Sequence, residues 1–142
     1  MARNELVHER LTDSVLGAFY RVYNGLHFGF LESLYVRALE LELIERGHQV
    51  GREVSVPVFY RGHELGRQRL DMVVDGVLVV EAKSTDELPR HAERQLYNYL
   101  RATNLEIGLL LHFGLKPSFR RVLCGRGRRL RVAVSGASGV SE

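Results

Sequence analysis

Two apolar runs, residues 70–74 and 77–83, flank an Asp-Gly pair and predict a β-hairpin. Three charged residues interrupt these runs: Asp71 lies in the first, and Glu81 and Lys83 lie in the second. Charged side chains are rarely buried unless they are paired or bind a metal ion. The charged residues within this hairpin therefore indicate a chemical role.

The length of the turn decides whether these charges share a face of the sheet. A two-residue turn at Asp75-Gly76 places Asp71 and Glu81 on opposite faces. A three-residue turn over Val74–Gly76 pairs Asp71 with Val79 and brings the carboxylate of Glu81 diagonally close. A shared site therefore requires the three-residue turn or a β-bulge.

Length and composition favour a single globular domain. The chain has 142 residues, of which 45% are hydrophobic and 26% are charged. A lone cysteine, Cys124, excludes an internal disulfide and a cysteine-built metal site. The first residues form no apolar secretory segment, and no apolar run approaches membrane-spanning length. We therefore expect a cytoplasmic protein without a membrane partner.

Basic residues gather towards the C-terminus. Residues 107–141 contain seven Lys or Arg and no Asp or Glu, although the net charge of the chain is only +3. This distribution suits a polyanionic partner such as nucleic acid, and a solvated basic tail explains it equally well. We divide the chain into a domain over residues 1–124 and a basic, then Gly/Ser-rich, tail over residues 125–142.

Hydrophobic periodicity predicts the order of helices and strands. Helices are expected over about residues 5–26, 30–46 and 86–103, the third with Asp86 as its N-cap residue. Strands are expected over about residues 49–60, 64–74, 77–83, 107–113 and 119–123. The order α-α-β-β-β-α-β-β predicts an α/β fold. Its mixed sheet combines an antiparallel meander with a further central strand, and helices flank it.

Two of the predicted helices carry polar residues that could contribute to a site. Glu32 is the one acid on an otherwise apolar face of the second helix. A first-turn acid favoured by the helix dipole is the simpler explanation for Glu32 taken alone. Gln95 and Tyr99 lie one turn apart on the third helix, one turn after His91, which we expect to face solvent. The histidines show no metal-binding spacing.

The hairpin charges suit the hydrolysis of phosphodiesters. Carboxylates such as Asp71 and Glu81 are the hard oxygen ligands that Mg²⁺ and Mn²⁺ prefer. Such an ion lowers the pKa of bound water and stabilises negative charge on phosphoryl oxygens. A lysine at position 83 can orient the attacking water and offset the charge of the phosphate.

Three motifs of the chain resemble those of a known group of enzymes. Leu70-Asp71 with Glu81-Ala82-Lys83 resembles the bipartite motif of the PD-(D/E)XK nuclease superfamily, with leucine in place of the usual proline. The segment Gly29–Tyr35 is similar to the signature of a small bacterial family within it, the GxxExxY proteins. Gln95–Tyr99 resembles the Gln-x-x-x-Tyr motif of the RecB-type members. The resemblance spans roughly residues 11–123.

The resemblance implies a restriction-endonuclease-like core and a Mg²⁺- or Mn²⁺-dependent nuclease. Asp71, Glu81, Glu32 and the carbonyl of Ala82 would hold the metal ion, and Lys83 would be the catalytic lysine. The residues expected to support the site or contact nucleic acid are Gln95, Tyr99, Tyr35, Arg120 and Arg121. DNA is the expected substrate, and a homodimer is compatible with the motifs.

Two other functions remain open from the sequence. A catalytically silent module would keep the nuclease fold and bind nucleic acid through the basic C-terminal segment. A structural or protein-interaction domain is the third option, but it leaves the charges of the hairpin unexplained.

Overall fold

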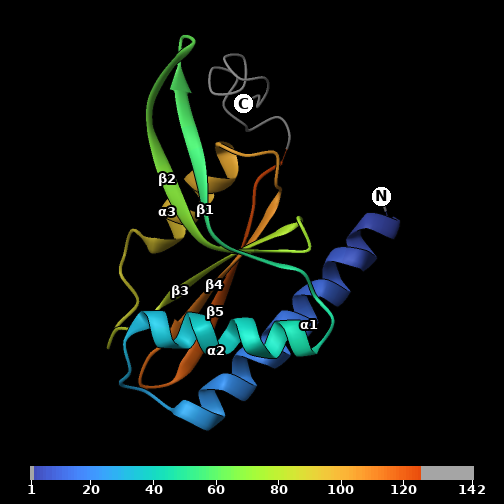
Figure 1. Cartoon of the computed structure of the whole chain (residues 1–142), viewed down its shortest axis with the longest axis vertical. Coiled ribbons are helices and arrows are strands. Elements are labelled where there is room, and N and C mark those ends of the chain that lie inside the picture. Colours follow the sequence, from blue (N-terminus) through green and yellow to red (C-terminus); the bar gives the residue numbers. More distant parts are fainter. Residues whose placement is uncertain (1, 126–142) are drawn as a thin grey trace.

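A five-stranded mixed sheet forms the centre of the computed structural model, which describes residues 2–125 (Figure 1). Apart from Gly125, the predicted tail lies outside the described residues. The elements are α1 (Ala2–Leu26), α2 (Glu32–Glu45), β1 (Val50–Tyr60), β2 (His63–Val74), β3 (Leu78–Lys83), α3 (Ala92–Arg101), β4 (Ile107–Phe113) and β5 (Pro117–Leu123). Their order confirms the predicted α/β fold.

The strands lie in the order β1-β2-β3-β4-β5. All neighbouring pairs are antiparallel except β3 and β4, which are parallel because α3 connects them as a crossover. Every residue of β4 is buried, which confirms that this apolar strand is covered on both faces. No helix of the described part is long and apolar enough to cross a membrane.

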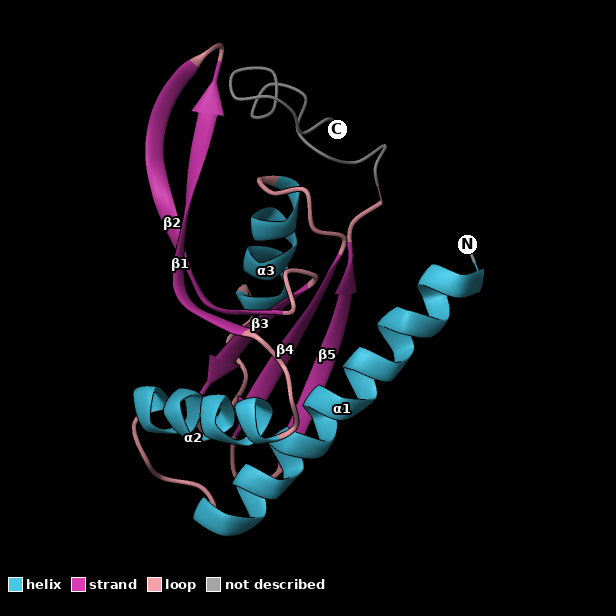
Figure 2. Ribbon diagram, turned by 45° about the vertical axis from the view of Figure 1, so that its right-hand side comes forward, coloured by secondary structure: helices cyan, strands magenta, loops and turns pink. Residues whose placement is uncertain are grey.

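Helices cover both faces of the sheet (Figure 2). One face packs on α1 and α2 through residues such as Val80 and Leu109. The other face packs on α3 through the alternate residues Val79 and Leu110. This alternation places consecutive side chains of β3 in different layers, so it also determines the layer in which a charged residue of β3 can lie.

The turn between β2 and β3 has the predicted length, but it lies one residue further along the chain. Val74 pairs with Leu78, so the turn is Asp75–Val77, and the register aligns Asp71 with Glu81. The predicted turn over Val74–Gly76, and the pairing of Asp71 with Val79, are therefore wrong.

The shift of the turn has its cause in the two residues directly before β1. The amide of Asp75 donates to Gln49 O at 2.8 Å, its Oδ1 accepts from Gln49 N at 2.8 Å, and its Oδ2 lies 2.8 Å from His48 Nδ1. His48 Nε2 in turn lies 2.7 Å from Ser14 Oγ on α1. Asp75 thus extends the β1–β2 ladder and cannot occupy the middle of the turn.

Helix α3 starts six residues later than predicted. Asp86 is exposed in the preceding loop, so its assignment as N-cap is wrong. The residue before a proline is disfavoured in helical conformation, and Pro89 therefore keeps Leu88 out of the helix. The helix begins with Ala92, whose amide donates to Pro89 O at 3.1 Å.

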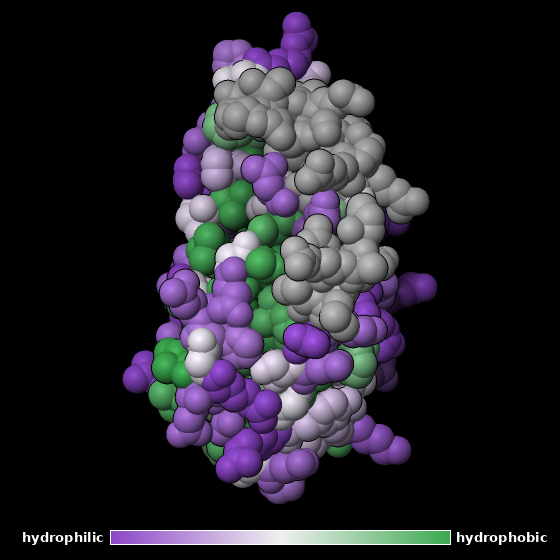
Figure 3. Space-filling model, turned by 90° about the vertical axis from the view of Figure 1, so that its right-hand side faces the viewer, coloured by the Kyte–Doolittle hydropathy of each residue, from purple (hydrophilic) through white to green (hydrophobic). Residues whose placement is uncertain are grey.

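The hairpin of β1 and β2 extends well beyond the sheet (Figures 1 and 2). Residues 61–69 are all exposed, and the hydrophilic tip lies at the top of the molecule in Figure 3. The pairing nevertheless continues to Tyr60 and His63, with a shift in register after Val58. We call this projecting part, residues 55–69, the ribbon.

Gly108 of β4 allows α3 to approach the sheet closely. A Cβ at this position would lie 2.9 Å from Leu96 Cδ1, and Leu96 is fully buried and cannot move aside. We predict that Gly108→Ala lowers the free energy of unfolding by about 1–3 kcal/mol through overpacking. Urea unfolding measures this change.

Gly66 of the ribbon offers a matched control. A Cβ there would meet nothing within 4 Å. Gly66→Ala should leave the stability unchanged or raise it by less than about 1 kcal/mol. Equal losses of stability in the two variants would contradict the packing argument.

Candidate functional site

Strands β2 and β3 separate at the position of the charged residues. Their regular pairing ends at Met72 and Val80. Beyond this pair, the amide of Asp71 donates to Glu81 Oε2 at 3.0 Å, and the amide of Ala82 donates to Asp71 Oδ2 at 2.9 Å. Each acid therefore replaces a backbone carbonyl as the acceptor for the opposite strand. We call this point the fork, and it holds Asp71 and Glu81 side by side.

Glu81 is the most deeply buried acid of the fork, with 6% of its surface exposed. Burial raises its pKa to about 8, and the nearby charges of Asp71 and Glu32 act in the same direction. The Asp71 amide and the Lys83 ammonium oppose the shift only in part. A site of this kind favours the binding of a cation, because a cation allows both acids to ionise.

Glu32 reaches the fork from the first turn of α2. Its pKa is raised by burial and then by the charge of Asp71, whereas Lys83 and the Ser84 amide lower it. Ser84 also donates from its hydroxyl to Phe30 O at 2.7 Å, which ties the loop before α2 to the end of β3. The start of α2 is thereby fixed next to the last residues of β3.

Lys83 lies two residues after Glu81 and therefore on the same face of β3. The chain that follows is anchored by His112 of β4, the residue aligned with Lys83 in the parallel ladder. His112 Nε2 lies 2.8 Å from Thr85 O and 3.1 Å from Thr85 Oγ1. This contact fixes the path of the chain directly after the lysine.

The third helix contributes Tyr99 to the site but not Gln95. Tyr99 is 9% exposed, and burial followed by the charges of Glu81 and Asp71 raises its pKa. Gln95 instead lines a separate polar cavity of about 260 Å³ between α3 and Gln68 of the ribbon. Of this predicted pair, only Tyr99 has a pKa that is shifted by the charges of the acids.

Tyr35 lies in the core and positions the loop before α2. Its ring is fully buried and stacks on Phe113 with the ring centroids 4.3 Å apart. The Phe30 amide donates to Tyr35 Oη at 3.2 Å, and Tyr35 Oη donates to His27 O. Tyr35 therefore holds the loop that leads to Glu32.

The two arginines predicted to bind nucleic acid lie away from the fork. Arg120 and Arg121 are on β5, which β4 separates from β3. As neighbours in a strand they point to opposite faces, and Arg120 Nε lies 3.9 Å from Glu93 of α3. One nucleic-acid strand at the fork would not meet both of them.

The structure adds Glu53, which the sequence analysis missed. The β1–β2 register places Glu53 opposite Asp71, and its φ of 50° is left-handed, which is unusual for a residue other than glycine. Glu53 lies in a strand with an ordinary alternating pattern, so the sequence carries no signal for this kink. The two neighbours of Asp71 in β2 lie in different layers. Leu70 packs against the α3 layer, whereas Met72 packs against α1 and α2.

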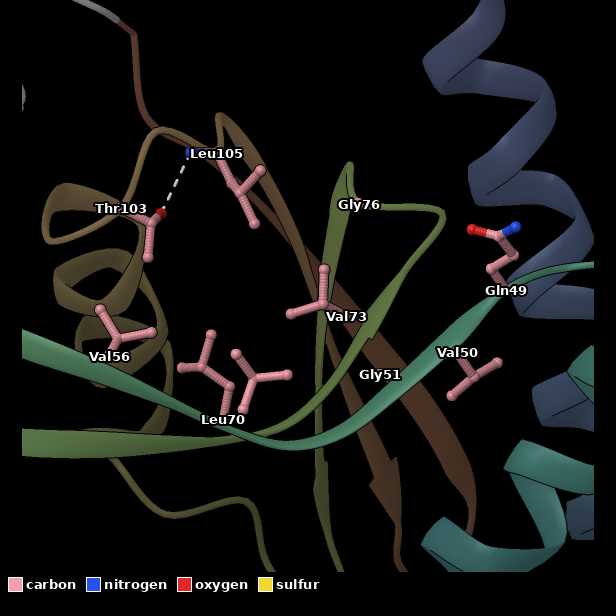
Figure 4. A pocket seen from close by; sticks show the side chains of 10 residues that line it. Gln49, Val50, Gly51, Val56, Leu70, Val73, Gly76, Thr103 and Leu105 are labelled. Atoms are coloured by element: carbon pink, nitrogen blue, oxygen red, sulfur yellow. Dashed lines mark hydrogen bonds between the residues drawn. The ribbon is translucent and has the colours of Figure 1, made fainter.

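A polar cavity of about 280 Å³ opens between α2 and the base of the ribbon, and it includes Glu32, Glu53 and Asp71. A larger cavity of about 470 Å³ lies along β1, and its lining is mainly apolar (Figure 4). Thr103 and Leu105 close one side of the larger cavity. It contains no acid, so the smaller polar cavity is the better match for chemistry at charged groups.

The number and chemistry of the acids at the fork show whether they suit a metal ion. Among the residues with described side chains, no group of three or more His, Cys, Asp or Glu could hold a metal ion. The predicted set of Glu32, Asp71 and Glu81 is thus not gathered in this way. Mg²⁺, however, is usually bound by one or two carboxylates and keeps several waters. The pair at the fork fits such an ion.

Comparison with known proteins now gives the family. The sequence profile of the PD-(D/E)XK nuclease superfamily matches residues 9–122. The chain belongs to this superfamily. No curated protein and no solved structure gives a significant match. Membership of the PD-(D/E)XK nuclease superfamily implies nucleic acid as the class of substrate.

We predict that Glu81→Gln removes a pH-dependent loss of stability in the metal-free protein. Between the ordinary pKa of 4.5 and the folded value of about 8, the unfolded chain releases this proton more readily. The free energy of unfolding therefore falls as the pH rises through this range. At pH 9 the variant should be more stable than the parent by more than about 1.4 kcal/mol, the equivalent of one pKa unit.

Urea unfolding in EDTA at pH 5 and pH 9 measures this difference. Glu45→Gln, at an exposed position of α2, is the matched control and should keep the decline of the parent. An equal decline in Glu81→Gln would contradict the prediction.

The kink at Glu53 predicts an unusual order of stabilities. Glycine adopts a φ of 50° without steric strain, whereas a β-branched residue does not. Glu53→Gly should be at least as stable as the parent, and Glu53→Val should be less stable by about 1–3 kcal/mol. At Glu64, an exposed position of β2, valine should instead be preferred over glycine. Urea unfolding measures the four stabilities. If valine is preferred over glycine at both positions, the left-handed backbone at Glu53 is contradicted.

Proposed function

We propose that the chain is a Mg²⁺- or Mn²⁺-dependent nuclease that hydrolyses phosphodiester bonds, with DNA as its substrate. The observation that carries this proposal is the fork, where Asp71 and Glu81 each accept a hydrogen bond from the opposite strand. Each carboxylate keeps a second oxygen for other partners. Two adjacent carboxylates beside a lysine suit a metal ion and a phosphate together.

The side chains have distinct roles in this proposal. Asp71 and Glu81 would hold the ion, with the Ala82 carbonyl as a further ligand. When bound, the ion would supply a Lewis acid and a bound water of lowered pKa. Lys83 would orient the attacking water and offset the charge of the phosphate.

Glu32 and Tyr99 would complete the surroundings of the reacting group. Glu32 accepts a hydrogen bond from the Ser84 amide, and it lies close enough to Asp71 and Lys83 for their charges to shift its pKa. It would assist in binding the ion or its waters. Tyr99 would exclude water from the buried side of Glu81, because burial is the main cause of its raised pKa. Gln95 would contact the nucleic-acid backbone further along α3.

The narrower assignment to the GxxExxY proteins is part of this proposal, and the geometry of its motif supports it. Gly29 has a φ of 125°, which other residues rarely adopt. Tyr35 holds the loop that follows Gly29, because its hydroxyl accepts a hydrogen bond from the Phe30 amide. The motif thus positions Glu32 next to the fork. A bacterial origin, a cytoplasmic location and a homodimer that cuts both strands remain predictions.

A cleavage assay tests the proposed function. We expect the protein with Mg²⁺ or Mn²⁺ to cut at least one of a panel of single-stranded, duplex and branched DNA and RNA. Asp71→Asn and Lys83→Ala should each lower the rate by at least about 100-fold, because each removes a group that acts in the transition state. Gel analysis under single-turnover conditions measures the rates.

Glu45→Gln, at an exposed position of α2, should cleave at the parental rate, which excludes a general effect of removing one charge. Equal rates in the parent and in the Asp71→Asn, Lys83→Ala double variant would overturn the proposal. Binding of nucleic acid without cleavage, unchanged by substitution at Asp71 or Glu81, would instead identify the catalytically silent module.

A further inference from the structure

The ribbon carries charges that the fork does not explain. It projects from the sheet without any described element packed on its outer part (Figures 1 and 2). Residues 55–69 contain three arginines against one glutamate. Ribbons of two strands are among the few elements that fit the grooves of nucleic acid. The question is therefore which part of the ribbon faces the fork.

Two arginines of β2 form a row that ends at the site. Side chains alternate along a strand, so Arg67 and Arg69 share a face of the ribbon. Arg69 lines the same polar cavity as Asp71, so the row ends beside the fork. Gln68, between the two arginines, lines the different cavity next to α3. The arginine row thus faces the α2 side, where the fork opens.

The present partners of these arginines leave them available. Arg69 is 72% exposed and lies 3.8 Å from Glu53, and Arg67 is 50% exposed and lies 3.4 Å from Glu64. Exposed pairs at such distances contribute little to stability, so a phosphate can replace the glutamates. Arg67 Nε also donates to Ser55 Oγ at 2.7 Å, which holds its guanidinium on this face of the ribbon.

We propose that Arg67 and Arg69 bind consecutive stretches of the phosphate backbone and lead one nucleic-acid strand to Asp71. Positions two apart in a strand are separated by about 6.7 Å, and a duplex advances about 3.4 Å per nucleotide. Arg69 therefore contacts the backbone about two nucleotides from the scissile phosphate, and Arg67 about four. The inference rests on the proposed function, because it identifies how that site binds its substrate.

The test is the salt dependence of binding in EDTA, where no cleavage can occur. Fluorescence anisotropy with a 20-nucleotide DNA, single-stranded and duplex, gives the affinity between about 50 and 200 mM salt. At about 200 mM salt, the double variant Arg67→Gln, Arg69→Gln should bind the single-stranded DNA about tenfold more weakly. The slope of log affinity against log salt should become shallower by about 1.8 for duplex and about 1.4 for single-stranded DNA.

Two further proteins make this result specific. Arg10→Gln, Arg21→Gln removes the same charge from exposed positions of α1 and should leave the slope unchanged. Arg67→Lys, Arg69→Lys keeps the charge and should retain most of the slope, because a phosphate contact depends mainly on charge. Thermal unfolding should be the same for all variants, since each replaced side chain is largely exposed.

The inference is overturned if the glutamine variant of the ribbon keeps the parental slope, or if the α1 variant loses the same amount. A change in sedimentation of the ribbon variant without a change in slope would also overturn it, and would show that the ribbon binds a second copy of the chain. Failure of the proposed function is a separate outcome. If the parent never cleaves but the glutamine variant of the ribbon loses the slope, the ribbon still binds phosphate and only the catalytic proposal falls.

Discussion

The reciprocal hydrogen bonds at the fork are the interaction on which the candidate site depends. In a regular antiparallel pair, the amides of Asp71 and Ala82 would donate to carbonyl oxygens. Here they donate to the carboxylates of Glu81 and Asp71. A side chain is longer than a carbonyl group, so the two strands move apart where their acids meet. The same contacts satisfy buried amides and stabilise the acids that they hold together.

Three other elements reach the fork, each by a different physical means. Helix α2 is fixed by Ser84, which binds both Glu32 and the loop before the helix. Helix α3 packs closely on β4 because Gly108 has no side chain, and Tyr99 follows from this packing. Strand β1 contributes the kink at Glu53. The site therefore depends on helix packing and strand geometry that lie outside its bipartite motif.

Much of this arrangement could be predicted from local pattern, and the exceptions have tertiary causes. The alternation and apolar runs of the strands predicted the order of the elements and the mixed sheet, and the charges within the hairpin indicated Asp71, Glu81 and Lys83 as candidates. The exact turn could not be predicted, because His48 and Gln49 determine it from a distant part of the chain.

The start of α3 and the position of the basic residues on β5 depend on different features of the chain. The predicted third helix included Pro89, but the loop before α3 includes it instead. The basic residues of β5 were grouped by composition, although neighbours in a strand face opposite layers. The acids of the fork could be proposed from the sequence because a hairpin brings its two strands together whatever the exact register.

The charge of the fork explains why the ribbon matters to the proposed function. Glu32, Asp71 and Glu81 face a single lysine, so in the absence of an ion the site repels a polyanion at high pH. A metal ion would offset part of this repulsion, but it acts only at the reacting phosphate. Neighbouring phosphates need a separate source of positive charge, and the two arginines of β5 face opposite sides of the sheet, two strands away from β3. Arg69 of the ribbon lines the same cavity as Asp71, which places the ribbon arginines well to bring nucleic acid to an acidic site.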